Sequence, residues 1–269
     1  MRTSARCAAI AGVVAAAPAC SLLVSTSDLS ATQIPADGGA GDALRPDDGG
    51  QQDTDGSDAS WCPVGALICD DFERTTPLGG WDNALLDRGG TQEIVHGTPF
   101  GRALAVAVPA GSSGYARAAL QRTKREQIGD FFTYRSRLRV NALPDTGGVN
   151  LNEMYFHRAD SQRASVFFAL RSGAIALFEQ DCSPGCSKQQ SYDLGSFSIG
   201  EWHDVVVRVD FSVKPSRLTA EIDGTVVHSN ESAVDLPPGA VEITAGISFT
   251  TTPHGGASVH VDRVAVEGR

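Results

Sequence analysis

The sequence predicts an all-β domain made of two antiparallel sheets packed as a sandwich. Apolar and polar residues alternate with a period of two along ten segments, whereas helical periodicity is scarce. Gly, Pro, Asp or Asn occupies most of the gaps, as expected of a sandwich or barrel. The predicted strands are residues 104–108, 131–140, 149–157, 164–170, 175–179, 203–211, 217–222, 225–228, 241–249 and 258–267.

The clearest single turn joins two of these strands. Residues 217–222 and 225–228 are separated only by Asp223 and Gly224. A type I′ turn requires positive φ at both central residues, and Asp-Gly tolerates this well. The pair therefore predicts a tight β-hairpin.

The first 19 residues have the pattern of a signal peptide. Two arginines precede an uncharged run at 8–17, which is too short to span a hydrocarbon layer of about 30 Å. An Ala-Pro-Ala sequence then precedes Cys20. The segment resembles the lipidation signal of bacterial lipoproteins, which would place a lipid on Cys20 and, with Ser21 next to it, permit transfer to an outer membrane. Simple secretion after the same cut is the alternative.

Residues 20–60 are predicted to be a disordered, acidic tether. Positions 28–60 hold eight Asp, one Arg and no aromatic residue, so they account for most of the net charge of −10. Such a stretch cannot bury enough apolar surface to offset its ordering entropy. The folded domain is therefore assigned to residues 61–269. Because no basic cluster occurs anywhere in the chain, nucleic acid is not expected as a partner.

Four cysteines of the domain form two close pairs. In an oxidising compartment we expect the disulfides Cys62–Cys69 and Cys182–Cys186. The alternative is a zinc site formed by all four thiolates, although neither spacing is that of a zinc ribbon.

Four segments share a pattern with a known family of β-sandwiches. They are residues 202–210 followed by the Asp-Gly turn, the opening segment 69–73, the next segment 100–104 and the closing segment 261–266. Together they resemble the concanavalin A-like lectin/glucanase superfamily, and in particular its laminin-G-like domains. The resemblance covers nearly the whole domain and implies a jelly-roll sandwich.

Two features of this resemblance concern single residues. Trp202 is expected to anchor the core at a strand start, with its N–H bonded to the backbone. The alternative is that its ring is a platform for a sugar. Many domains of the superfamily hold one calcium ion where the opening and closing strands meet, and the resemblance implies a structural Ca²⁺ bound by Asp262, by Asp71 or Glu73, and by a carbonyl near Gly101. Alternatively, Asp262 bonds only to the backbone of its own strand.

The strand at 149–157 is where glycosidases of this superfamily would carry a Glu-x-Asp-x-Glu motif. This chain has Glu153, Tyr155 and His157 there, which share one face of the strand. One carboxylate cannot supply both the acid and the nucleophile of a retaining mechanism. The three side chains therefore predict a sugar-contact strip, and the alternative is an ordinary solvated strand face.

Arg135, Arg137 and Arg139 also share one face of a predicted strand. They suggest a site for acidic glycans, or a solvent-exposed ladder compensated by nearby acids. Alginate lyases of this fold use Arg near Glu, but their R-x-E-x-R and Tyr-, Lys- and Gln-bearing motifs are missing.

The sequence thus predicts an exported, envelope-anchored module that binds a glycan or a cell-surface protein without catalysis. The membrane would be reached only through the N-terminal lipid. Two alternatives are a diverged glycoside hydrolase or polysaccharide lyase of the same fold, and a structural envelope protein with no ligand of its own.

Overall fold

A computed structural model describes residues 61–111, 114–126, 128–144, 147–158, 162–171, 173–182, 186, 188–251 and 253–269. The predicted signal peptide, Cys20 and the tether lie outside these residues. Within the described part of the chain, no helix has the length and hydropathy needed to cross a membrane.

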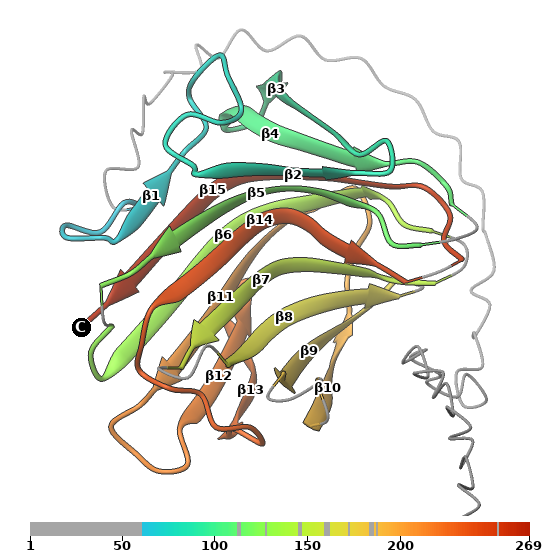
Figure 1. Ribbon diagram of the computed structural model, residues 1–269. Coiled ribbons are helices and arrows are strands. Elements are labelled where there is room, and N and C mark those ends of the chain that lie inside the picture. Colours follow the sequence, from blue (N-terminus) through green and yellow to red (C-terminus); the bar gives the residue numbers. More distant parts are fainter. Residues whose placement is uncertain are drawn as a thin grey trace, which may run out of the picture. The chain divides into compact units, whose positions relative to one another are not determined.

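The described residues form fifteen strands in two antiparallel sheets (Figure 1). The eight-stranded sheet has the spatial order β13 (Thr225–Glu231), β12 (Arg217–Ile222), β11 (Trp202–Asp210), β6 (Phe131–Ala142), β15 (Ala257–Gly268), β4 (Gly101–Val108) and β3 (Thr91–Thr98), with β1 (Ile68–Asp70) paired to β15. The seven-stranded sheet has the order β10 (Lys188–Ser196), β9 (Ala174–Asp181), β8 (Arg163–Arg171), β7 (Val149–His157), β14 (Val241–Thr250), β5 (Arg117–Lys124) and β2 (Asn83–Asp87).

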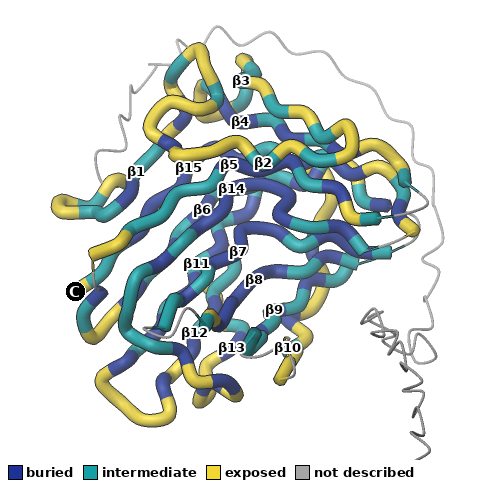
Figure 2. Tube along the Cα trace, in the orientation of Figure 1, coloured by how far each residue is buried: buried dark blue, intermediate teal, exposed yellow. Residues whose placement is uncertain are grey.

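Alternating burial along the central strands shows why the two sheets pack face to face. In β11, Val205, Val207 and Val209 are fully buried and belong to a single apolar cluster, while the residues between them are partly exposed. The same alternation is visible along the central strands in Figure 2. The predicted all-β sandwich is therefore confirmed, and each sheet has one outer face that points away from the shared core.

The predicted hairpin between β12 and β13 is also confirmed. Asp223 and Gly224 have φ of 51° and 75°, as a type I′ turn requires. The Asp223 carboxylate also makes two contacts outside the turn. It accepts hydrogen bonds from His203 Nδ1 at 2.7 Å and from the backbone N–H of Asp204 at 2.9 Å. The turn is thus tied to the start of β11.

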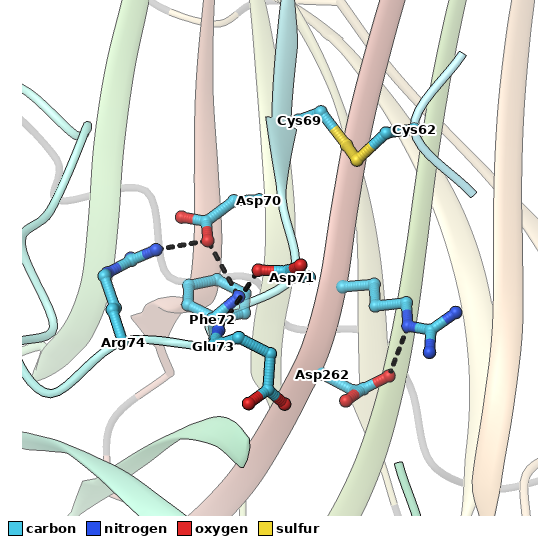
Figure 3. Close-up of a disulfide and its surroundings, with 9 residues drawn as sticks. Cys62, Cys69, Asp70, Asp71, Phe72, Glu73, Arg74 and Asp262 are labelled. Atoms are coloured by element: carbon cyan, nitrogen blue, oxygen red, sulfur yellow. Dashed lines mark hydrogen bonds and ion pairs between the residues drawn. A yellow bond between two sulfur atoms is a disulfide. The ribbon is translucent and has the colours of Figure 1, made fainter. Parts of the chain in front are cut away.

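Both predicted disulfides are present. Cys62 is bonded to Cys69 in β1, and Cys182 is bonded to Cys186 just after β9. Figure 3 shows the first bridge beside the segment that follows β1. Because the four sulfurs pair with one another, the zinc alternative is excluded. β1 in turn pairs with β15, so the opening and closing strands meet as the resemblance implied.

Four strands, β2, β3, β5 and β10, were not predicted from the sequence. Three of them lie at sheet edges, and β10 is the clearest case, because seven of its nine residues are exposed. An edge strand with little buried surface needs no apolar alternation, so the period-two signal is weak there. β5 lies inside its sheet, but its buried residues are three consecutive small or aliphatic ones, Ala118 to Leu120, which do not alternate.

A β-bulge interrupts β7 at Asn152. This residue has φ of 50°, and the pairing of β7 with both neighbours shifts between Leu151 and Met154. The Asn152 side chain is buried, and its Oδ1 accepts a hydrogen bond from the Gly246 N–H at 3.1 Å. The extra residue lets both Leu151 and Met154 join the core, although they are three positions apart.

Candidate functional site

The predicted contact residues fall into two groups that the fold keeps apart. Glu153, Tyr155 and His157 lie on β7 of the seven-stranded sheet, whereas Arg135, Arg137 and Arg139 lie on β6 of the eight-stranded sheet. In both strands the alternate residues belong to the core cluster, so the predicted residues occupy the outer faces. The two groups therefore lie on opposite sides of the sandwich and do not form one site.

Side chains from four strands of the seven-stranded sheet gather around Tyr155. The register sets Tyr155 opposite Glu242 on β14 and Ser165 on β8, and His157 opposite Arg163. The Arg163 guanidinium lies 4.3 Å from the centre of the Tyr155 ring. We call this set the Tyr155 face; it comprises Gln121, Glu153, Tyr155, His157, Arg163, Ser165, Glu242 and Thr244.

Two titratable groups at the centre of the Tyr155 face, Glu153 and Tyr155, have raised pKa values. Glu153 is only 7% exposed, and burial raises the pKa of its carboxyl, although contacts with Tyr155, Ser248 and Arg163 partly oppose the shift. Burial and the nearby Glu153 carboxyl also raise the pKa of the Tyr155 phenol. Both groups are thereby biased toward their neutral, proton-donating forms.

A second carboxylate, Glu242, joins Glu153 on this face. Gln121 Nε2 donates a hydrogen bond to Glu242 Oε1 at 2.7 Å, and His157 Nε2 lies 3.8 Å from Glu242 Oε2. Sequence reasoning missed Glu242, Gln121 and Arg163 because each lies on a different strand from the predicted motif. Only the pairing register places them together.

Aromatic pairs extend the same outer face in two directions. Phe167 on β8 and Phe178 on β9 stack with their ring centres 5.2 Å apart. Tyr115, just before β5, stacks on Phe249 of β14 at 5.2 Å and is 43% exposed. The Arg117 guanidinium lies 5.3 Å from the centre of the Tyr115 ring, so a second Tyr–Arg pair accompanies Tyr155 and Arg163.

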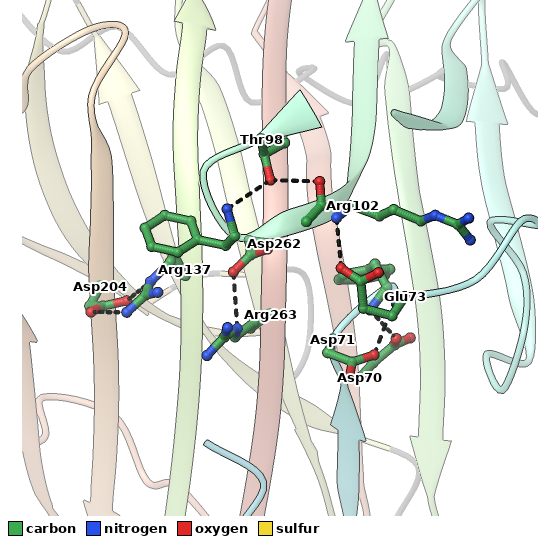
Figure 4. A network of polar contacts seen from close by, with 12 residues as sticks. Asp70, Asp71, Glu73, Thr98, Arg102, Arg137, Asp204, Asp262 and Arg263 are labelled. Atoms are coloured by element: carbon green, nitrogen blue, oxygen red, sulfur yellow. Dashed lines mark hydrogen bonds and ion pairs between the residues drawn. The ribbon is translucent and has the colours of Figure 1, made fainter. Parts of the chain in front are cut away.

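The predicted arginines of β6 are engaged within the protein. Arg137 donates two hydrogen bonds to Asp204, at 2.7 and 2.9 Å (Figure 4). Its guanidinium lies 4.3 Å from the centre of the Phe100 ring. Arg135 forms a 3.4 Å ion pair with Glu267. Acids thus compensate two of the three cations, as expected for a ladder on a sheet surface. We call the outer face of the eight-stranded sheet the Arg137 face.

Trp202 does not anchor the core, so that prediction was wrong. It is partly exposed on the Arg137 face, where its ring centre lies 5.7 Å from that of Phe100 and 5.2 Å from the Arg139 guanidinium. Its Nε1 has no hydrogen-bond partner among the described residues. The register explains the difference, because His203 takes the inward position at the start of β11.

Two of the predicted calcium ligands, Asp71 and Glu73, are engaged in hydrogen bonds with backbone N–H groups. The Glu73 Oε1 accepts a hydrogen bond from the Arg102 N–H at 2.7 Å, and a Cβ added to Gly101 would lie 2.1 Å from that oxygen. Asp71 accepts a hydrogen bond from the Glu73 N–H at 3.1 Å. Figure 3 shows these acids beside Asp262.

The Asp262 carboxylate forms an ion pair with an arginine and no hydrogen bond with the backbone of its strand. It lies at a bulge of β15, is 1% exposed, and its Oδ2 is 3.1 Å from Arg263 Nε. Neither carboxylate oxygen accepts a hydrogen bond from the described backbone, so the backbone-bonding alternative was wrong. Among the described residues, no group of three or more His, Cys, Asp or Glu is arranged to hold a metal ion. The structural Ca²⁺ stays a prediction.

Comparison with known proteins shows the fold. The sequence matches no protein-family model and no curated protein. Among solved structures, an endo-β-1,4-glucuronan lyase from the fungus Trichoderma reesei superposes with a TM-score of 0.60 at 18% identity, over 76% of this chain and 96% of the lyase.

Two further structures have the same architecture. The cellulose-induced protein Cip1 superposes with a TM-score of 0.51 at 14% identity, over 75% of this chain and 97% of Cip1. A double-cysteine variant of alginate lyase A1-II′ gives 0.50 at 16% identity, over 66% of this chain and 84% of the lyase. The domain therefore has the same β-jelly-roll fold as these three proteins.

The buried Asp262 predicts a specific pH dependence of stability. Burial raises the pKa of its carboxyl from 3.8 to about 6, with Arg263 opposing the shift. Because the folded state holds this proton more tightly than the unfolded state, Asp262 should lower stability as the pH rises from about 4 to about 6, by on the order of 1–2 kcal/mol. Asp262→Asn should remove that decline in urea unfolding measured across this range.

The matched control is Asp235→Asn, a change at a side chain that is 75% exposed, and this variant should keep the decline in stability from pH 4 to pH 6. Stability curves of the wild type and Asp262→Asn that stay parallel from pH 4 to pH 6 would contradict the prediction.

Proposed function

We propose that this concanavalin A-like jelly roll binds a polysaccharide chain along the Tyr155 face. The observation that carries the proposal is the Arg163 guanidinium packed over the Tyr155 ring, with hydrogen-bonding side chains from four strands around it. A tyrosine offers a flat apolar surface and a polar tip, which suits the mixed apolar and hydroxylated surface of a sugar.

The charges of the face favour a sugar acid. Arginine presents a fork of donors that matches a carboxylate. Because burial biases Glu153 toward its neutral form, the centre of the face carries less negative charge than its two acids suggest. The names of two structurally similar proteins, a glucuronan lyase and an alginate lyase, indicate acidic polysaccharides as their substrates, which supports the proposal.

The extent of the face favours a chain over a single sugar. Tyr115 stacks on Phe249 near the end of β14, whereas Tyr155 pairs with Glu242 near its start. With about 3.3 Å per strand residue, these two Tyr–Arg pairs are roughly 20 Å apart or more along the sheet. A ligand that contacts both must span several sugar residues.

A second candidate function is cleavage of the bound chain by β-elimination, and the neutral Tyr155 phenol beside His157 favours it. His157 would take the proton from the carbon next to the carboxylate, and the electron pair left behind would form the carbon–carbon double bond as the bond to the leaving oxygen breaks. Tyr155 would donate its proton to that oxygen. Arg163 would hold the sugar carboxylate.

The binding proposal predicts that Arg163→Ala weakens the affinity for oligoglucuronate about tenfold, because one charge-assisted contact is lost. Calorimetry with oligoglucuronate and oligoalginate measures this. Arg217→Gln, an exposed change on β12, is the matched control and should bind as the wild type does.

Unchanged affinity of Arg163→Ala for every acidic probe, with the variant shown folded, would contradict binding at this face. Cleavage is tested separately by the ultraviolet absorbance of an unsaturated product. Product formed by the wild type and lost in Tyr155→Phe, with binding retained, would establish the lyase; no product from the wild type would leave a binding module.

We also propose a structural calcium ion near Asp262, Glu73, Asp71 and Gly101. The buried carboxylate of Asp262, which accepts no hydrogen bond from the described residues, supports it, and the ion pair with Arg263 opposes it. A bound Ca²⁺ should raise the thermal unfolding midpoint over that in EDTA, and Asp262→Asn should abolish the rise. Equal midpoints of the wild type with Ca²⁺ and with EDTA would rule the ion out.

We further propose that the chain is exported and held at the cell envelope through a lipid on Cys20. The Ala-Pro-Ala sequence before this cysteine and the acidic segment behind it support the proposal. Bacterial cells supplied with labelled fatty acid should incorporate label into the wild type and not into Cys20→Ala. Equal labelling of both chains would contradict a lipid on Cys20. No labelling of the wild type, with the protein found in the medium, would favour simple secretion.

A further inference from the structure

The Arg137 face contains a depression of about 370 Å³ over strand β4, on the opposite side of the sandwich from Tyr155. Its volume falls within the lower range of small-molecule pockets. Its floor is low because Ala105 and Ala107, the outward residues of β4, carry only methyl groups. The lining residues that face it from the three strands include Thr91, Glu93, Ala105, Ala107, Ser258 and His260.

Strand pairing builds polar walls on both sides of this floor. Glu93 on β3 is opposite Ala105, and Ala105 is opposite His260 on β15. Thr91 and Ser258 flank Ala107 in the same way. A carboxylate and a hydroxyl thus face an imidazole and a hydroxyl across the alanine floor.

The imidazole of His260 is fixed in one tautomer. Arg139 Nη2 lies 3.0 Å from His260 Nδ1, and because a guanidinium can only donate, Nδ1 must accept. Burial and the neighbouring Arg139 also lower the pKa of His260, against the opposing effect of the Glu93 carboxylate, so the neutral ring is favoured. The proton of the neutral ring therefore lies on Nε2, for which no hydrogen bond is formed within the described residues.

Trp202 extends this row on the far side of Arg139. The register sets Arg139 opposite both His260 and Trp202, and the Arg139 guanidinium lies 5.2 Å from the centre of the indole ring. The indole and guanidinium therefore hold the position of His260 from behind. The hydrogen-bond donor of the depression, His260, is thus held in place by Arg139 and Trp202 packed behind it.

These groups suit two neighbouring hydroxyls of an uncharged sugar. His260 Nε2–H can donate to one hydroxyl, the Glu93 carboxylate can accept from the other, and the hydroxyls of Thr91 and Ser258 can do either. The methyl floor would contact the apolar side of the ring. Glu93 in the wall disfavours an anionic ligand, and the nearby Arg139 disfavours a cationic one.

We infer that the depression over Ala105 and Ala107 is a second carbohydrate-binding site, specific for an uncharged sugar residue. It goes beyond the proposed function and does not depend on it, because it shares no residue with the Tyr155 face. With both sites occupied, one chain would bridge an acidic polysaccharide and a neutral glycan.

The test measures binding of neutral oligosaccharides of glucose, galactose, mannose and xylose to the full chain by calorimetry. At least one should bind the wild type. Ala107→Leu, which fills the depression, and Glu93→Gln, which removes the charged acceptor, should each weaken its binding about tenfold or more. Thr225→Leu and Glu231→Gln are matched changes at exposed positions of β13 in the same sheet, and both should bind as the wild type does.

Urea unfolding of each variant separates lost binding from lost structure. No binding of any neutral probe to the wild type would overturn the inference. Undiminished binding by Ala107→Leu and Glu93→Gln would overturn it as well. Loss of neutral binding in these variants, with oligoglucuronate binding unchanged, would support the second site and leave the Tyr155 face to be judged on its own test.

Discussion

The pairing of β7 with β14 and β8, adjusted by the bulge at Asn152, decides which side chains meet on the Tyr155 face. The buried amide of Asn152 fixes the bulge through Gly246, and the bulge keeps Leu151 and Met154 in the core. A slip of one residue in β7 would turn Tyr155 inward and expose Met154. The proposed site therefore depends on the same core packing that stabilises the sheet.

The central arginines of the two outer faces, Arg137 and Arg163, differ in their partners. On the Arg137 face the guanidiniums are held by acids and aromatic rings, and Arg137 with Asp204 is the clearest case. On the Tyr155 face Arg163 lies over a tyrosine, beside a carboxyl that burial holds toward its neutral form. A ligand carboxylate would thus be accommodated more readily beside Arg163 than beside Arg137.

The sequence was sufficient for the architecture because its strongest signals are local. Alternation along β11 and the Asp223-Gly224 turn follow from side-chain direction and backbone preference, and both were confirmed. The candidate site was predicted only along one strand. Arg163 and Glu242 come from strands distant in sequence, and no local pattern marks them as neighbours of Tyr155. The prediction that Trp202 anchors the core failed for a related reason, because the direction of its side chain depends on where the alternation of β11 begins.

The most direct test of polysaccharide binding at the Tyr155 face is a chemical-shift titration of the isotope-labelled full chain with oligoglucuronate. Binding at the Tyr155 face should give saturable shifts of amide signals from β7, β8 and β14 around Tyr155, Arg163 and Glu242, while those around Arg137 and Asp204 stay in place. Shifts confined to the Arg137 face, or no saturable shift at any concentration, would contradict it.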